Sequence, residues 1–108
     1  MTKNNKTIKK LAIDKDKITQ FCQKNHICQF SFFGSILRDD FGDNSDVDVL
    51  VEFHNQASVG LFELYDMEQE LSNLFGGRKV DINTKNSLSK YFHSKVIKEM
   101  DIQYDKTR

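Results

Sequence analysis

Apolar and polar positions alternate most regularly between residues 46 and 53. Four apolar residues fall on one side of this stretch and mostly polar ones on the other: Val47, Val49, Val51 and Phe53 against Asp46, Asp48, Leu50 and Glu52. Successive side chains of a β-strand point to opposite faces, so the pattern predicts a strand. Two more strands are expected. Ile27–Phe33 is a nearly continuous apolar run, typical of a strand covered on both faces, and Arg78–Asn83 sets Asp81 opposite its apolar neighbours.

Helical spacing of apolar residues predicts helices between these strands, over residues 14–25, 58–75 and 86–100, with a short helical turn at 36–41. The Gly76-Gly77 pair is expected to end the second helix, because glycine readily adopts the left-handed conformation of a C-terminal cap. The residues expected to face the core from this helix are Leu61, Leu64, Tyr65, Leu71, Leu74 and Phe75.

The alternating order of helices and strands predicts an α/β (α+β) fold with helices packed on a small sheet. Residues 102–104 are expected to add a short edge strand. No linker or repeat divides the chain, so we expect one domain over residues 14–108, preceded by a basic N-terminal tail over residues 1–13.

Composition narrows the class of protein. The 108 residues carry 16 Lys and Arg against 16 Asp and Glu, so net charge gives no reason to expect a nucleic-acid or membrane partner. No apolar run reaches the roughly 18 residues that span a bilayer, and the basic start leads into no apolar stretch, so we expect a cytoplasmic protein. Cys22 and Cys28 have neither redox nor zinc-site spacing and are expected to be reduced and buried.

Three aspartates are the first candidates for chemistry. Asp46 and Asp48 leave the same face of one strand, with Cα atoms about 6.5–7 Å apart. Such carboxylates repel each other unless a cation joins them, and oxygen ligands favour a hard cation such as Mg²⁺. If the strand of Asp81 lies alongside, three carboxylates could hold two metal ions, the arrangement for in-line displacement at phosphorus.

A pair of aspartates on a strand is, by itself, more often only a solvated face. Gly34 and Ser35 shift the balance, because they end the preceding strand and open a helical turn. There a glycine lets a phosphate approach the backbone, while amide groups and the Ser35 hydroxyl supply hydrogen-bond donors.

The segments Gly34–Arg38 and Ser45–Asp48 together resemble the signature of the nucleotidyltransferase superfamily with a DNA polymerase beta-like fold. The likeness covers about residues 14–104 and is closest to the minimal nucleotidyltransferases, the MntA-type antitoxins paired with HEPN-domain ribonucleases. Leu37 and Asp39 depart from the usual Ala and Gly, and Asp39 adds a negative charge near the phosphate loop. Later segments that extend the likeness are LVEF, LFELYDMEQELSNLFGGRKVDINT and LSKYFHSKVIKEM.

This resemblance implies a small mixed sheet flanked by helices and a site for ATP. Gly34 and Ser35 would hold the β- and γ-phosphates. Arg38 is a further candidate for contact with phosphates or partner, or else a solvated arginine, and Ser45 would orient the loop or cap a turn.

The resemblance also implies that Asp46 and Asp48 bind Mg²⁺, while Asp81 completes the site for two ions and helps to activate the attacking hydroxyl. The expected function is that of an antitoxin that transfers AMP from ATP to tyrosine hydroxyls of a HEPN ribonuclease toxin, within a hetero-oligomer. Because the chain ends soon after Asp81, we expect a partner protein to supply the acceptor. The alternatives are steric masking of the toxin without catalysis, and nucleotidyl transfer to a small molecule such as an antibiotic.

Overall fold

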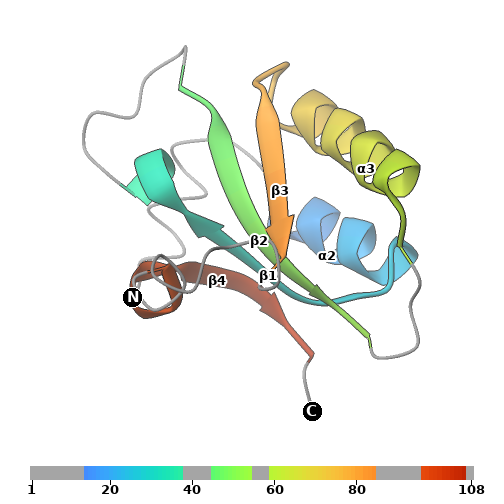
Figure 1. The fold of residues 1–108 in the computed structure, drawn as a ribbon, viewed down its shortest axis with the longest axis horizontal. Coiled ribbons are helices and arrows are strands. Elements are labelled where there is room, and N and C mark those ends of the chain that lie inside the picture. The colour runs from blue at the N-terminus through green and yellow to red at the C-terminus, as the bar shows by residue number, and fades with distance from the viewer. Residues whose placement is uncertain (1–13, 38–44, 55–58, 85–95, 107–108) are drawn as a thin grey trace.

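A four-stranded mixed sheet forms the centre of the protein (Figure 1), which we describe from a computed structural model over residues 14–37, 45–54, 59–84 and 96–106. The strands lie in the order β3-β2-β1-β4. β2 pairs antiparallel with β1 and parallel with β3, and β4 pairs antiparallel with β1. Their bounds are Ile27–Phe33 for β1, Val47–Phe53 for β2, Val80–Thr84 for β3 and Asp101–Asp105 for β4. The α/β class, the mixed sheet and the short C-terminal strand are confirmed.

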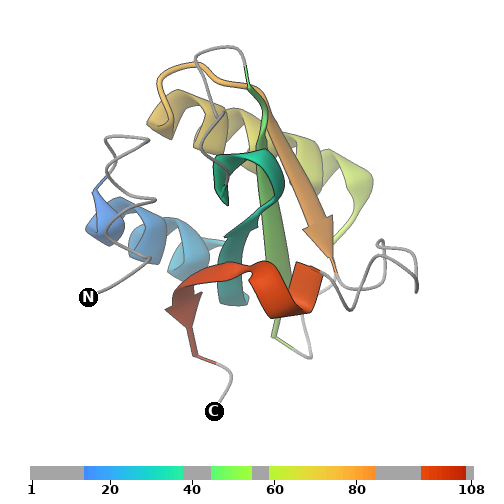
Figure 2. The same cartoon turned by 90° about the vertical axis from the view of Figure 1, so that its left-hand side faces the viewer.

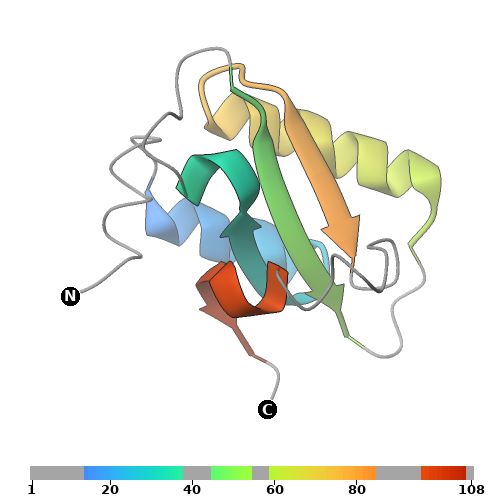
Figure 3. The same cartoon turned by 60° about the vertical axis from the view of Figure 1, so that its left-hand side comes forward.

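Two helices, α2 (Lys15–Lys24) and α3 (Leu61–Leu74), cover one face of this sheet. Figure 3 shows both behind the strands, with the 3₁₀ helix η1 (Gly34–Leu37) and helical residues 96–99 on the near side. Residues 38–41 of the expected helical turn and 86–95 of the expected last helix lie outside the described residues.

The main core lies between the sheet and the two helices. Asp14 caps α2 by accepting a hydrogen bond from the Asp16 backbone N–H at 2.9 Å. The ring of Phe21 then meets that of Phe30 on β1 edge to face, with centroids 6.2 Å apart. The buried residues of this core include Ile18, Phe21, Cys22, Phe30, Phe32, Val47, Val49, Val51, Leu71 and Val80. The alternation read from the sequence of β2 therefore sets which side faces the core.

A smaller apolar cluster covers part of the opposite face. Phe33, Leu50 and Val96 are buried in it. Val96 belongs to the helical residues 96–99 that precede β4 (Figure 2), and the Met100 N–H donates to the Val96 carbonyl at 2.8 Å. β1 is thus covered on both faces, as its apolar run predicts.

The start and end of α3 follow local chemistry. Ser58, the expected start, lies outside the described residues, and the helix begins after Gly60, whose N–H donates to Glu63 Oε1 at 3.0 Å. At the other end, Gly76 and Gly77 have φ of 76° and 91°. Both are left-handed, so the predicted glycine stop is confirmed.

The expected inward face of α3 is wrong at Leu61 and Tyr65, whereas Leu64 packs against the main core as expected. Leu61 and Tyr65 are 84% and 59% exposed, next to Phe62 at 88%. Met67, which the expected core did not include, is buried together with Leu71. Within the described residues, the side chains of α3 that pack against the main core are Leu64, Met67, Leu71 and Leu74. Helical spacing gives the direction of a side chain but not whether a neighbouring element covers it.

Both cysteines are buried and neither forms a disulfide, as expected. Burial raises the pKa of the Cys22 thiol to about 12. In the described part of the chain, no helix has the length and apolarity to cross a membrane.

Candidate active site

Three strands bring the predicted site residues to one end of the sheet. β1 runs antiparallel to β2, while β3 runs parallel to it, so the end of β1 meets the starts of β2 and β3 (Figure 1). In register, Phe33, Asp48 and Asp81 form one row across these strands. Side chains directly opposite each other on neighbouring strands share a face. Asp48 and Asp81 therefore lie side by side, away from the main core.

Gly34 follows Phe33 directly and approaches Asp48 closely. Its φ is 77°, a conformation that L side chains rarely adopt. A Cβ atom added there would lie 2.5 Å from Asp48 Oδ2 and 3.2 Å from its Cγ. The position thus needs glycine for the backbone and for the neighbouring carboxylate. The contact with Asp48 is thus a reason for glycine at this position besides the approach of a phosphate expected from the sequence.

Asp46 lies one residue before β2 and is exposed, while Asp48 and Asp81 are half-buried. The entry to β2 is tied to the entry to β3. The Val47 N–H donates to the Lys79 carbonyl at 2.9 Å, and Arg78 Nη1 donates to the Ser45 carbonyl at 3.3 Å. These bonds hold the segment that carries the first aspartate against the strand that carries the third.

Sequence reasoning did not single out two residues that support this geometry. Arg78 bonds to a segment 33 residues away, and Glu68 on α3 accepts a hydrogen bond from the Ile82 N–H, 14 residues away, at 2.9 Å. Neither contact has a local signal. From the pattern of α3 alone, Glu68 is indistinguishable from other polar residues of the helix.

Two further candidates, Ser35 and Arg38, lie partly or wholly outside the described residues. Ser35 lies in η1 beside Gly34, but its side chain is outside the described part, as is the whole of Arg38. Among the residues described, no three or more His, Cys, Asp or Glu side chains gather closely enough to hold a metal ion. The donor set nevertheless fits a hard cation, because carboxylate oxygens on neighbouring strands are the ligands that Mg²⁺ prefers.

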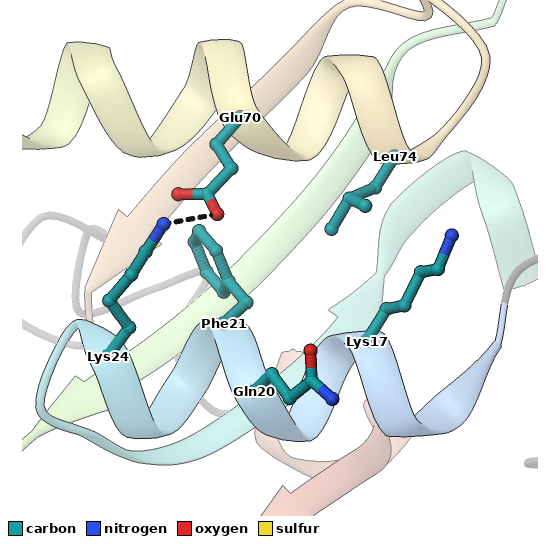
Figure 4. A pocket seen from close by; sticks show the side chains of 6 residues that line it. All are labelled: Lys17, Gln20, Phe21, Lys24, Glu70 and Leu74. Carbon is teal, nitrogen blue, oxygen red and sulfur yellow. Dashed lines mark hydrogen bonds and ion pairs between the residues drawn. The ribbon is translucent and has the colours of Figure 1, made fainter.

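A pocket of about 320 Å³ lies elsewhere, between α2 and α3 (Figure 4). Lys24 and Glu70 form an ion pair across it, with Nζ and Oε2 2.6 Å apart. Its lining consists of Lys17, Gln20, Phe21, Lys24, Glu70 and Leu74. None of the predicted site residues belongs to this set, so the candidate site is the open end of the sheet and not this pocket.

The chain is similar in sequence to known proteins. The family model described as "Polymerase beta, Nucleotidyltransferase" matches residues 16–108. "Putative protein adenylyltransferase MJ1217" of Methanocaldococcus jannaschii is 35% identical over 77 residues, which is 71% of this chain and 76% of the relative.

Two solved structures share the fold. A chain of a toxin-antitoxin crystallised with AMP-PNP superposes with a TM-score of 0.71 at 18% identity, over 88% of this chain and 76% of that one. A chain from the complex of tri-AMPylated Shewanella oneidensis HEPN toxin with MNT antitoxin gives 0.62 at 18% identity, over 84% and 69%. At these identities the likeness shows the fold alone. The family match and the 35% identical relative show more: this chain belongs to the polymerase beta-type nucleotidyltransferases.

Proposed function

We propose that the chain is an antitoxin that transfers AMP from ATP to a tyrosine hydroxyl of a HEPN ribonuclease toxin and so neutralises it. The row that sets Asp48 beside Asp81, with Gly34 against Asp48, carries the proposal. It brings two carboxylates to the start of η1, where the backbone can take up a phosphate, and this supports transfer of a nucleotidyl group to a hydroxyl.

The residues of the site have two roles, phosphate binding and metal binding. Gly34 and Ser35 bind the β- and γ-phosphates at the start of η1, with Arg38 and Ser45 as further contacts. Asp46, Asp48 and Asp81 are the residues that would hold Mg²⁺ once nucleotide is bound. When bound, the metal neutralises phosphate charge and lowers the pKa of a hydroxyl beside it.

The transfer forms a bond between the tyrosine oxygen and the α-phosphorus, while the bond from that phosphorus to the bridging oxygen breaks and pyrophosphate leaves. A phenol has an ordinary pKa near 10 and is a poor nucleophile at neutral pH. Asp81 accepts the phenol proton as the new bond forms. Because Asp81 lies beside Asp48, this base would be next to a triphosphate bound there.

Two observations support a protein as the acceptor. The relative at 35% identity has a name that describes a protein adenylyltransferase. Among the structures with this fold is an antitoxin in complex with a toxin that carries AMP groups. AMP attached near an RNA-binding surface adds negative charge, which repels the RNA backbone. In this proposal the partner is a HEPN protein, and the chain itself makes no direct contact with nucleic acid.

The test is to mix the chain with Mg²⁺, ATP and a HEPN protein encoded beside it, and to weigh both proteins by mass spectrometry. We expect AMP adducts on the toxin. Asp81→Ala should lower the transfer rate by at least about 100-fold, the usual contribution of a general base. ATP affinity, measured by calorimetry with Mg²⁺ and with chelator, should fall only modestly in this variant but strongly in chelator.

Asp66→Ala is the matched control, because Asp66 is an exposed carboxylate on α3. It should leave transfer unchanged. Full neutralisation of the toxin by Asp81→Ala, with no adduct, would mean that steric masking is the function. Adducts on an antibiotic and none on the toxin would favour a small-molecule acceptor.

A further inference from the structure

We infer that Glu68 on α3 is a positioning residue for Asp81, because it holds the edge strand on which Asp81 lies. The inference rests on the proposed function only for its catalytic consequence. The contact that carries it is the hydrogen bond from the Ile82 N–H to Glu68 Oε2 at 2.9 Å.

β3 needs such support. It has five residues, Val80–Thr84, and among the described strands it is the outermost on its side, with β2 as its one partner. A short edge strand presents backbone N–H groups that no neighbouring strand satisfies. Its side chains Asp81, Ile82, Asn83 and Thr84 are all only half-buried, so side-chain packing holds this strand less firmly than the central ones.

The direction of the bond follows from strand geometry. In a parallel pair, backbone groups of alternate residues point toward the neighbouring strand. The N–H of Ile82 points away from β2, toward α3, and the helix supplies a carboxylate where a further strand would supply a carbonyl. A hydrogen bond to a carboxylate is stronger than one between two neutral groups.

Glu68 is distinct from the other glutamates of its helix. Glu63 accepts from the Gly60 N–H at the start of α3, and Glu70 pairs with the Lys24 ammonium on α2. Of these three, Glu68 alone reaches the sheet. Its bonded amide belongs to the residue directly after Asp81, so a shift of this peptide changes the direction in which the Asp81 carboxylate leaves the strand.

Different contacts therefore fix the two parts of β3 on either side of Asp81. Arg78 and the Lys79 carbonyl fix the entry of the strand against β2, and Glu68 fixes the peptide just beyond the aspartate. Asp81 therefore lies between two anchored points. Freeing the second one should leave ATP bound by the loop and β2 but let the base move relative to the acceptor.

The experiment uses the full chain and three variants. Glu68→Leu removes the acceptor and keeps the bulk, Glu68→Gln keeps an acceptor oxygen, and Glu70→Leu removes a carboxylate of the same helix that bonds elsewhere. Amide hydrogen exchange by NMR reads the Ile82 N–H directly. We expect Glu68→Leu to speed its exchange by roughly tenfold or more, with β2 amides unchanged. Glu68→Gln should stay within about threefold, and Glu70→Leu should match the native chain.

Two further readouts separate positioning from folding. In Glu68→Leu the carboxyl carbon resonance of Asp81 should shift, and AMP transfer should slow by roughly 10- to 100-fold at an unchanged KM for ATP. Glu68→Gln should recover most of the rate. Should Glu68→Leu not fold, the same ordering is read from Glu68→Gln against Glu70→Gln, with a smaller expected change.

Unchanged Ile82 exchange and an unchanged Asp81 resonance in Glu68→Leu would overturn the inference, whether or not the chain transfers AMP. Faster exchange with full transfer would overturn it as well, since Asp81 would then need no such support. If the native chain transfers no AMP, the proposed function fails, while exchange and the Asp81 resonance still decide whether Glu68 positions Asp81.

Discussion

Replacing Gly34 by alanine tests the tightest contact in the candidate site. The substitution adds one methyl group at a position where φ is 77° and where that methyl carbon would lie 2.5 Å from Asp48 Oδ2. Two penalties therefore act together. One is local to the backbone, and the other acts on a carboxylate of the site.

The magnitudes can be worked out separately. An L-residue in the left-handed region costs about 1–2 kcal/mol relative to glycine. To restore a van der Waals contact of about 3.4 Å, the carboxylate oxygen or the turn must move by about 0.9 Å (3.4 − 2.5). Such overpacking costs about 1–3 kcal/mol. We expect Gly34→Ala to lower the free energy of unfolding by about 2–5 kcal/mol. On the proposed function, it should slow AMP transfer by roughly 100-fold, because the Asp48 carboxylate is displaced by almost 1 Å.

Gly76 offers a matched control. Its φ of 76° is nearly identical, but no atom lies within 4 Å of an added Cβ. Gly76→Ala should therefore lose only the backbone part, about 1–2 kcal/mol, and keep native transfer per folded molecule. Urea denaturation gives the free energies of both variants, and transfer is measured well below their midpoints.

The reasoning fails if Gly34→Ala loses no more stability than Gly76→Ala. It also fails if Gly34→Ala transfers AMP at the native rate, since the carboxylate could then move aside without consequence. Loss of transfer without extra loss of stability would point instead to a phosphate that needs the space.

Two further predictions concern the core. Burial raises the pKa of Cys22 to about 12, so unfolding releases a proton between the ordinary thiol pKa of 9.0 and that value; stability should be constant with pH below about 9 and fall by up to about 1.4 kcal/mol per pH unit above it. Denaturation at several pH values measures this, and a Cys22→Ala variant with the same slope would contradict it. Leu71→Ala should cost about 2–5 kcal/mol because the side chain is fully buried, whereas Phe62→Ala, at 88% exposure, should change stability by no more than about 0.5 kcal/mol. Equal losses of stability in thermal melts of the two variants would contradict the burial of Leu71 and the exposure of Phe62.

Local patterns predicted those features that local chemistry determines. The alternation in β2 identifies the core face, because a strand half-covered by helices must alternate. Gly76 and Gly77 end α3 because few other residues adopt their backbone conformation. Asp48 and Asp81 could be proposed as neighbours only on the assumption that their strands pair, and the parallel register meets that assumption.

The remaining features depend on contacts between distant segments. Helical spacing placed Leu61 and Tyr65 on the inner side of α3, but spacing contains no information on how far the neighbouring elements extend. The bonds of Arg78 and Glu68 join residues 33 and 14 positions apart, with no pattern that marks either one. The close approach of Asp48 to Gly34 could not be predicted from the sequence, because that contact exists only in the folded chain, and the expected contact of Gly34 with a phosphate stays a prediction.

The register of β3 on β2, which pairs Asp81 with Asp48, affects what fraction of the folded molecules has a correctly assembled site. Side-chain direction along a strand alternates with a period of two, so a slip of one residue would turn Val80 and Ile82 out of the core and drive the Asp81 charge into it. The misaligned sheet is thus penalised by the same residues that stabilise the correct one. Inactive but compact molecules with a shifted third strand should be rare. The folded fraction of a preparation, measured by any structural probe, should then equal the fraction with the two carboxylates side by side.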